Sequence, residues 1–116
     1  ESDDAGETWQ PPERTEIPNP AAKVNLLRAH DGRIFLLHNP VPLEEGTPRG
    51  RKPLSLWVSD DDMRTWRVKV DLVTDADPRA NLNYPDGFLD EERGELCFVW
   101  EDTVRVYLMR VPMEIA

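Results

Sequence analysis

The strongest constraint on this chain is a motif that occurs twice, with its two copies 57 positions apart. Residues 2–9 read SDDAGETW and residues 59–66 read SDDDMRTW, so both copies fit the pattern S-x-D-x-(G/M)-x-T-W. A motif that recurs at about this spacing is typical of repeat architectures, among them the β-propeller. Two repeats account for only two blades, whereas propellers usually contain about four to eight.

The rest of the sequence favours short strands. Eleven prolines and many turn residues divide the apolar runs, and no long stretch has a helical period. The Asp31-Gly32 pair between residues 24–29 and 33–38 predicts a hairpin, because the tight primed turns need positive φ. Residues 54–58 with 66–72 and residues 88–89 with 95–100 predict two more hairpins, and residues 104–111 predict a final strand.

These strands can be counted in propeller order, in which each blade has four antiparallel strands running outward from the axis. Residues 1–17 are expected to supply an outermost strand, residues 23–73 a complete blade, and residues 81–112 the first three strands of the next blade. We therefore expect an all-β chain with two four-stranded antiparallel blades in a single segment, residues 1–116. The loop at 39–52 is long for a compact domain, which is typical of functional or disordered segments.

Charge and composition exclude several classes of function. Lys and Arg number 14 against 23 Asp and Glu, a net charge of −9, which disfavours binding to nucleic acid. No apolar run approaches membrane-spanning length, so no membrane partner is expected. Cys97 is the single cysteine and lies in an apolar run, which indicates a buried core thiol. His30 and His38 are far from it in sequence, so neither a zinc site nor any cofactor is expected.

The repeated motif is interpreted as scaffold. A short carboxylate beside a Ser hydroxyl can hydrogen-bond the backbone of a turn, and the Trp is expected to bury between sheets. The residues given this structural role are Ser2, Asp4, Gly6, Thr8, Trp9, Ser59, Asp61, Thr65 and Trp66. Residues 60–62, three aspartates in a row, leave a calcium site as the alternative, since carboxylate oxygens suit that ion. Met63 stands at the glycine position, which indicates a modified second turn.

The motifs resemble the Asp-box, or BNR, repeats of the sialidase superfamily. Residues 16–20 (EIPNP), 31–40 (DGRIFLLHNP), 51–56 (RKPLSL) before an Asp box, and 83–85 (NYP) follow the order of the C-terminal third of bacterial exo-sialidase-like propellers. The resemblance covers nearly the whole chain and implies two blades of a six-bladed propeller. Family members are often secreted or periplasmic, and the sequence shows no targeting segment by which to assign a compartment.

The resemblance also implies two site residues. Arg51 stands where the family has one of its carboxylate-binding arginines, and a guanidinium fork matches a carboxylate well. Tyr84 stands where the family has its nucleophile, since sialidases use Tyr in place of a carboxylate. A phenol needs an adjacent base for that role. From the residues alone, the favoured interpretation is structural, with Arg51 an ordinary solvated cation and Tyr84 a core ring with a solvated hydroxyl.

The rest of the family's catalytic set would precede the first motif, so the resemblance implies a chain without most of it. We expect a module that is non-catalytic alone and that binds carbohydrate, with Trp57, Trp100 and Tyr84 offering aromatic surfaces, although packing within the blades is the favoured role of both Trp. Two open blades would expose strand edges and apolar faces. A homotrimer, in which three copies close a six-bladed ring, would cover them.

Two alternatives stay open at this point. In the first, the chain is a C-terminal piece of an exo-sialidase, a glycoside hydrolase, that supplies Arg51 and Tyr84 to a site completed elsewhere. In the second, it is a scaffold without a sugar ligand, in which a threefold ring of Arg51 near the axis would hold an anion.

Overall fold

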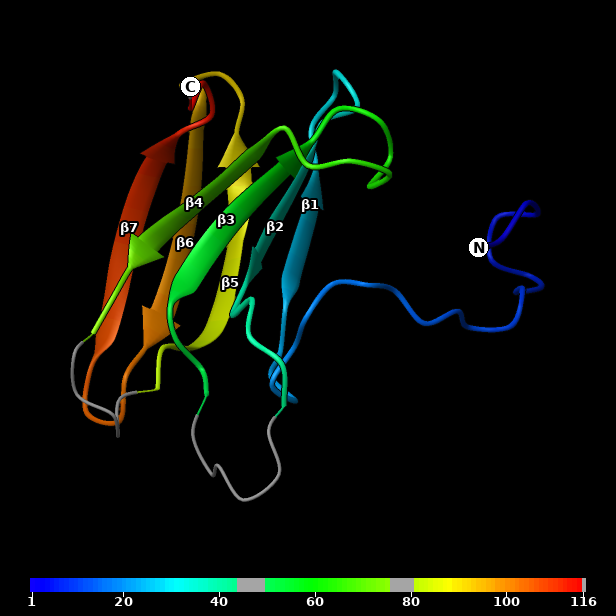
Figure 1. The fold of residues 1–116 in the computed structure, drawn as a ribbon. Coiled ribbons are helices and arrows are strands. Elements are labelled where there is room, and N and C mark those ends of the chain that lie inside the picture. The colour runs from blue at the N-terminus through cyan, green and yellow to red at the C-terminus, as the bar shows by residue number, and fades with distance from the viewer. Residues whose placement is uncertain (44–49, 76–80, 116) are drawn as a thin grey trace.

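The computed structural model describes residues 1–43, 50–75 and 81–115, and within these ranges the protein is all-β. Residues 44–49 of the long loop and residues 76–80, which include the expected Asp77-Pro78 link, lie outside the described residues. The strands are β1 (Asn25–Arg28), β2 (Ile34–His38), β3 (Leu54–Ser59), β4 (Val68–Val73), β5 (Asn83–Asp90), β6 (Glu95–Glu101) and β7 (Val106–Pro112). They form two antiparallel sheets, β1-β2-β3-β4 and β5-β6-β7 (Figure 1). The described residues contain no helix long and apolar enough to cross a membrane.

The predicted hairpins are confirmed. Arg28 at the end of β1 pairs with Ile34 at the start of β2, and the turn between them has Gly32 at φ 93°. The amide of Gly32 donates to the carbonyl of Ala29 at 3.0 Å and closes this turn. β3 pairs with β4 across the second motif, and β5 pairs with β6 across residues 91–94. Each expected turn therefore joins the two strands on either side of it.

The core lies between the two sheets, which pack face to face. Alternation along β2 directs Phe35 and Leu37 into this core, while Leu36 and His38 lie on the other face. The buried cluster takes residues from both sheets: Ala29, Phe35, Leu37, Leu54, Leu56, Val58, Val68, Leu82, Leu96, Phe98, Trp100, Val111 and Met113. Cys97 is buried and makes no disulfide, as the sequence predicted.

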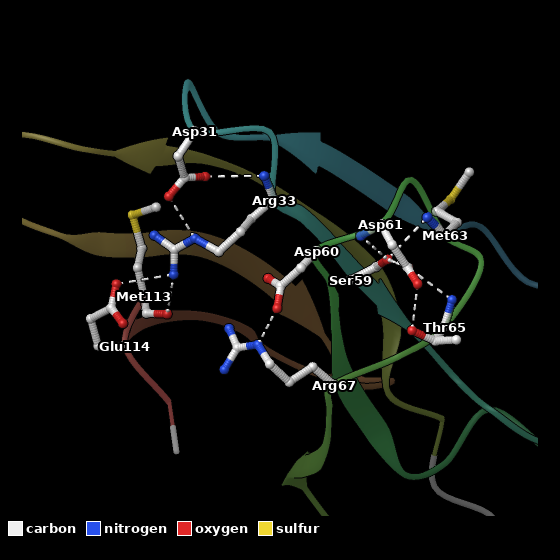
Figure 2. Close-up of polar contacts among 10 residues, drawn as sticks. All are labelled: Asp31, Arg33, Ser59, Asp60, Asp61, Met63, Thr65, Arg67, Met113 and Glu114. Carbon is white, nitrogen blue, oxygen red and sulfur yellow. Dashed lines mark hydrogen bonds and ion pairs between the residues drawn. The ribbon is translucent and has the colours of Figure 1, made fainter.

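An arginine fastens the end of the chain to the first hairpin. The Arg33 guanidinium donates to Asp31 at 2.8 Å and to the Met113 carbonyl at 3.2 Å, and it lies 3.0 Å from a Glu114 carboxylate oxygen. Figure 2 shows these three contacts converging on one side chain. The Arg33 side chain is 16% exposed, and its contacts hold residues 113–114 against the β1–β2 turn.

The expected outermost strand at residues 1–17 is not formed. The structure assigns no strand there, and the second sheet has three strands in place of the expected four. Figure 1 shows this N-terminal arm leading away from both sheets on the side of β1. A strand needs a neighbour for its backbone, and the arm meets none among the described strands; Pro11 and Pro12 also lack N–H donors. The limits of the two blades, and closure into a propeller, stay predictions.

Candidate functional site

The second Asp box closes on itself through side-chain hydrogen bonds (Figure 2). Asp61 accepts from the Thr65 amide at 2.8 Å and from the Thr65 hydroxyl at 2.6 Å. The Ser59 hydroxyl donates to Asp61 at 2.8 Å and accepts from the Met63 amide at 3.0 Å. The Thr65 bonds, followed by the Ser59 bond, lower the pKa of Asp61 to about 2. The Ser, Asp and Thr of the motif are therefore occupied by their own turn.

The first Asp box has the same contacts. Asp4 accepts from the Thr8 amide at 2.9 Å and from the Thr8 hydroxyl at 2.5 Å, and Ser2 donates to Asp4 at 2.8 Å. These bonds lower the pKa of Asp4 to about 2, with the Thr8 hydroxyl as the largest cause. The Gly6 amide donates to Ser2 at 2.9 Å. The motif thus folds alike whether it joins two strands or stands at the end of a free arm.

The glycine position tolerates Met63 without loss of the turn. Met63 has φ 66°, in the same left-handed region as Gly6 at 89°. The Met63 amide still reaches Ser59, as the Gly6 amide reaches Ser2. The sequence indicated a modified turn, and the structure shows the same bonds in both copies.

The two motif tryptophans differ in their surroundings. Trp66 is half-buried and lies 5.5 Å from Trp57, centroid to centroid. Trp9 is 72% exposed, and its indole N–H donates to the Gly6 carbonyl at 3.1 Å. The expectation that the motif Trp buries between sheets is therefore wrong for Trp9, because no sheet lies beside the arm.

The three consecutive aspartates do not converge on one point. Asp60 pairs with Arg67 at 2.5 Å, and Asp62 pairs with Arg28 at 2.6 Å. Asp61 accepts hydrogen bonds within its own turn. Within the described ranges, no group of three or more His, Cys, Asp or Glu side chains is arranged to hold a metal ion. The calcium alternative therefore has no ligand cluster to support it at this place.

The structure brings together the two residues that the resemblance implied. The Arg51 guanidinium carbon lies 5.5 Å from the centroid of the Tyr84 ring, within the range of a cation–π contact. Arg51 also donates to the Asn83 side-chain oxygen at 3.0 Å and to the Ala21 carbonyl at 3.3 Å. Its own carbonyl accepts from the Leu82 amide at 2.8 Å. These contacts fix the guanidinium beside the start of β5.

Tyr84 itself has an unusual backbone. Its φ is 53°, and the pairing of β5 with β6 shifts register between Asn83 and Asp86. Positive φ in a bulky residue is strained, and such strain is concentrated at functional sites. A bulge re-aims the side chains next to it, and the Tyr84 ring is half exposed. The strained backbone of β5 therefore coincides with an aromatic side chain that is exposed to solvent.

The surroundings of Tyr84 contain a second cation but no base for its hydroxyl. Lys23 donates to the Pro85 carbonyl at 3.0 Å and lies 3.5 Å from an Asp86 carboxylate oxygen. Across residues 1–43, 50–75 and 81–115, no side chain hydrogen-bonds the Tyr84 hydroxyl. The arrangement can hold an anion beside an aromatic ring, and it lacks a proton acceptor for the phenol.

The other two aromatic candidates, Trp100 and Trp57, differ in how far a ligand could reach their rings. Trp100 is 7% exposed and stacks on Tyr107 at 4.3 Å, so it packs the core and presents no surface to a ligand. Trp57 lies on the other face of the first sheet, under Lys69 at 4.1 Å from its ring centroid. These contacts support Trp57 as a packed ring with one cation above it.

The complete burial of His38 was not predicted from the sequence. Its ring is fully buried, lies 4.5 Å from the Trp57 ring, and has no hydrogen-bond partner at either nitrogen within the described structure. Burial, assisted by the charge of Lys69, lowers the pKa of His38 to about 4. The signal was a polar residue at the end of the continuous apolar run IFLL, which is typical of a strand covered on both faces.

Two face-to-face antiparallel sheets, with a self-closed Ser–Asp–Thr turn on the first of them and a second at the end of the arm, define an Asp-box repeat protein. The family model described as a BNR repeat-like domain matches residues 1–97, and the chain belongs to this family, the sialidase and Asp-box repeat family. Neither a curated protein nor a solved structure gave a match to this chain.

Proposed function

We propose that this protein is a sialidase-like Asp-box module that binds acidic sugars through Arg51 and Tyr84 and is not catalytic alone. The observation that carries the proposal is the contact of Arg51 with a tyrosine held at positive φ on a bulge. Membership of the BNR repeat-like family supports it, because both residues stand at positions implied by the family resemblance.

The chemistry of the pair suits a sugar carboxylate. A guanidinium has five N–H donors, and the described contacts of Arg51 use one donor toward Asn83 and one toward Ala21. The remaining donors can bind a carboxylate, while the half-exposed Tyr84 ring offers a flat apolar surface to a sugar ring. In a protein of net charge −9, Arg51 and nearby Lys23 attract an anion locally.

The surroundings of the Tyr84 hydroxyl support the proposal that the chain is not catalytic alone. A phenol with its usual pKa of about 10 is a poor nucleophile at neutral pH unless a neighbouring base takes its proton. No such base contacts Tyr84 within the described parts of the chain. Turnover would need groups brought by other blades.

Assembly into a six-bladed ring of three copies is the second part of the proposal. The outer face of the β5–β7 sheet exposes Phe88, Val99, Val106 and Leu108 to between 40% and 69%. Exposed apolar sheet faces next to open strand edges favour association, and cyclic closure covers a repeated heterologous contact.

A calorimetric titration with a free sialic acid tests the binding function, with its methyl ester as the neutral ligand. We expect Arg51→Lys to weaken binding of the acid about 10-fold or more, because Lys keeps the charge and loses the planar fork. Arg93→Lys, in the β5–β6 turn, is the matched control and should bind as the wild type does. Equal affinity for the acid and its ester would contradict the proposal.

The exo-sialidase reading remains a second candidate, favoured by the same strained Tyr84. A fluorogenic sialoside assay on the chain, with Tyr84→Phe beside it, separates the two. We expect no turnover from either protein. Turnover that Tyr84→Phe abolishes would establish the enzyme and reject a non-catalytic module. If an anion binds at Arg51 and no sugar binds, the result would instead support a scaffold without a sugar ligand.

A further inference from the structure

Within residues 1–43, 50–75 and 81–115, the structure contains both a segment that pairs with no strand and a sheet with an open edge. Residues 1–17 form no strand, and β7 is the last strand of the β5-β6-β7 sheet. An edge strand presents a row of unpaired N–H and C=O groups, which is a template for another segment of chain. β7 extends over seven residues, long enough to pair with an arm of similar length.

The face next to this edge is apolar. Leu108 pairs with Val99, and Val106 follows on the same side of β7, so these three side chains share the outer face of the sheet. Phe88 pairs with Cys97, two residues before Val99, and lies on that face as well. Phe88, Val106 and Leu108 are each more than 60% exposed. An open edge and an exposed apolar face therefore adjoin one another.

The charges of the two segments are complementary. Residues 1–17 contain six carboxylates and a single cation, Arg14, and two of the carboxylates, Glu13 and Glu16, lie within residues 8–17. Residues 104–112 contain two cations, Arg105 and Arg110, and no carboxylate. Opposite charge on two surfaces favours their encounter and fixes their register. The acidic arm is thus matched to the basic edge strand.

The direction of the arm favours a second copy over its own chain. Figure 1 shows the arm leaving beside β1, while β7 lies at the opposite side of the molecule. From the start of β1 outward, the residues that connect to the arm extend away from the β7 edge. Pro11 and Pro12 restrict the arm to an edge position, because only there can a proline nitrogen face solvent. Adjacent N–H groups alternate in direction, so one of the two prolines removes one hydrogen bond from the pairing.

We propose that residues 8–17 of one copy pair with β7 of a second copy, as the fourth and outermost strand of that copy's β5–β7 sheet. The exchange rests on the proposed assembly and names the contact that holds it together. It gives the arm a backbone partner, covers the β7 edge, and brings either Glu13 or Glu16, whose side chains point to opposite faces of a strand, toward Arg110 of the neighbouring copy.

Carbodiimide cross-linking of the full chain tests the exchange. Arg110→Lys keeps the positive charge and supplies an amine that the reagent joins to an adjacent carboxylate. Chains labelled with nitrogen-14 and nitrogen-15 are mixed, refolded together and cross-linked, and the linked peptides are identified by mass. Glu95 lies 3.7 Å from Arg110 within the same chain, so a Glu95–Lys link is the internal sign that the reagent acted.

We expect links from Glu13 or Glu16 to position 110 in mixed-isotope pairs, together with a trimer mass by light scattering. Links found in single-isotope pairs alone would overturn the exchange in favour of the arm's own β7. A trimer without any arm link would overturn the exchange and leave the ring standing. A dimer with mixed-isotope links would keep the exchange and reject the threefold ring, and a monomer would reject both.

Charge reversal gives an independent measurement. Arg110→Glu should weaken self-association about 3- to 10-fold, as expected for the loss of exposed ion pairs. Adding Glu13→Lys and Glu16→Lys in the same chain should restore association to near the wild-type constant. Glu92→Lys, exposed in the β5–β6 turn, should change nothing. Failure of the combined variant to recover would contradict the pairing of arm and β7.

Discussion

At the scale of single residues, His38 is the clearest case of a side chain at odds with its surroundings. Its ring is fully buried beside Trp57, and neither nitrogen has a hydrogen-bond partner within the described structure. Burial of an imidazole disfavours its charged form, and the nearby Lys69 charge adds to the effect. The fold therefore favours the neutral state of His38.

This predicts a loss of stability in mild acid. The folded pKa of about 4 lies below the ordinary value of 6.5, so the unfolded chain takes up the proton first as pH falls. The free energy of unfolding should drop by about 3 kcal/mol between pH 6.5 and pH 4, at about 1.4 kcal/mol per pKa unit. His38→Phe should remove most of this slope in urea titrations at several pH values. His30→Gln, at an exposed histidine, should keep it.

The two Asp boxes allow a matched comparison of Asp61 and Asp4. Both carboxylates accept the same set of bonds, but Asp61 joins β3 to β4 while Asp4 lies in the free arm. Asp61→Ala should lower the melting temperature by several degrees, and Asp4→Ala should leave it unchanged in dilute solution. Because the folded pKa of Asp61 is depressed to about 2, its contribution is present above pH 3.8 and lost as pH falls through 2. Equal melting shifts would refute this assignment.

The site residues were accessible to sequence reasoning only in part. Arg51 and Tyr84 came from a family resemblance, and the structure places them 5.5 Å apart. The positive φ of Tyr84 could not be foreseen, because no glycine or asparagine marks that position. The burial of His38 was indicated only by the continuous apolar run before it, because the extent of that burial depends on what covers the sheet.

At the scale of elements, β5 shows how close backbone approach shapes a strand. Gly87 faces Phe98, and a side chain there would lie 2.5 Å from Phe98 Cβ and overlap the Cys97 carbonyl oxygen. Gly87→Ala should therefore cost about 1–3 kcal/mol in urea unfolding, as for an overpacked core. Gly50→Ala, whose nearest neighbours would be at 3.6 Å, should stay within about 1 kcal/mol. Similar costs for both variants would show that Gly87 is not sterically required.

Most elements could be predicted because their turns are local. The Asp31-Gly32 turn and the second Asp box both specify their hairpins within a few residues. The outermost strand could not be fixed in this way, since pairing of residues 8–17 depends on a neighbour rather than on their own sequence. The prediction of an outermost strand, supplied to its own chain or to a neighbour, therefore stays a prediction.

At the scale of the whole molecule, the repeat spacing was enough to predict an all-β fold, while closure of a ring depends on surfaces meeting between copies. If copies associate, unfolding must depend on protein concentration. Each tenfold rise in concentration should stabilise the chain by about 1 kcal/mol in urea titrations. Leu108→Lys should abolish this dependence, because it places a charge in the apolar face of the β5–β7 sheet. Leu43→Lys, equally exposed at 65%, should preserve it; a concentration-independent wild type would argue against association.

The self-closed Asp box has a use beyond this protein. In the first Asp box, five hydrogen bonds among Ser2, Asp4, Gly6 and Thr8 form within seven residues and without help from any sheet. A turn whose geometry is complete in so short a stretch is transplantable. Grafted between two designed strands, it would bring its own conformation with it and leave the designer only the flanking register to choose.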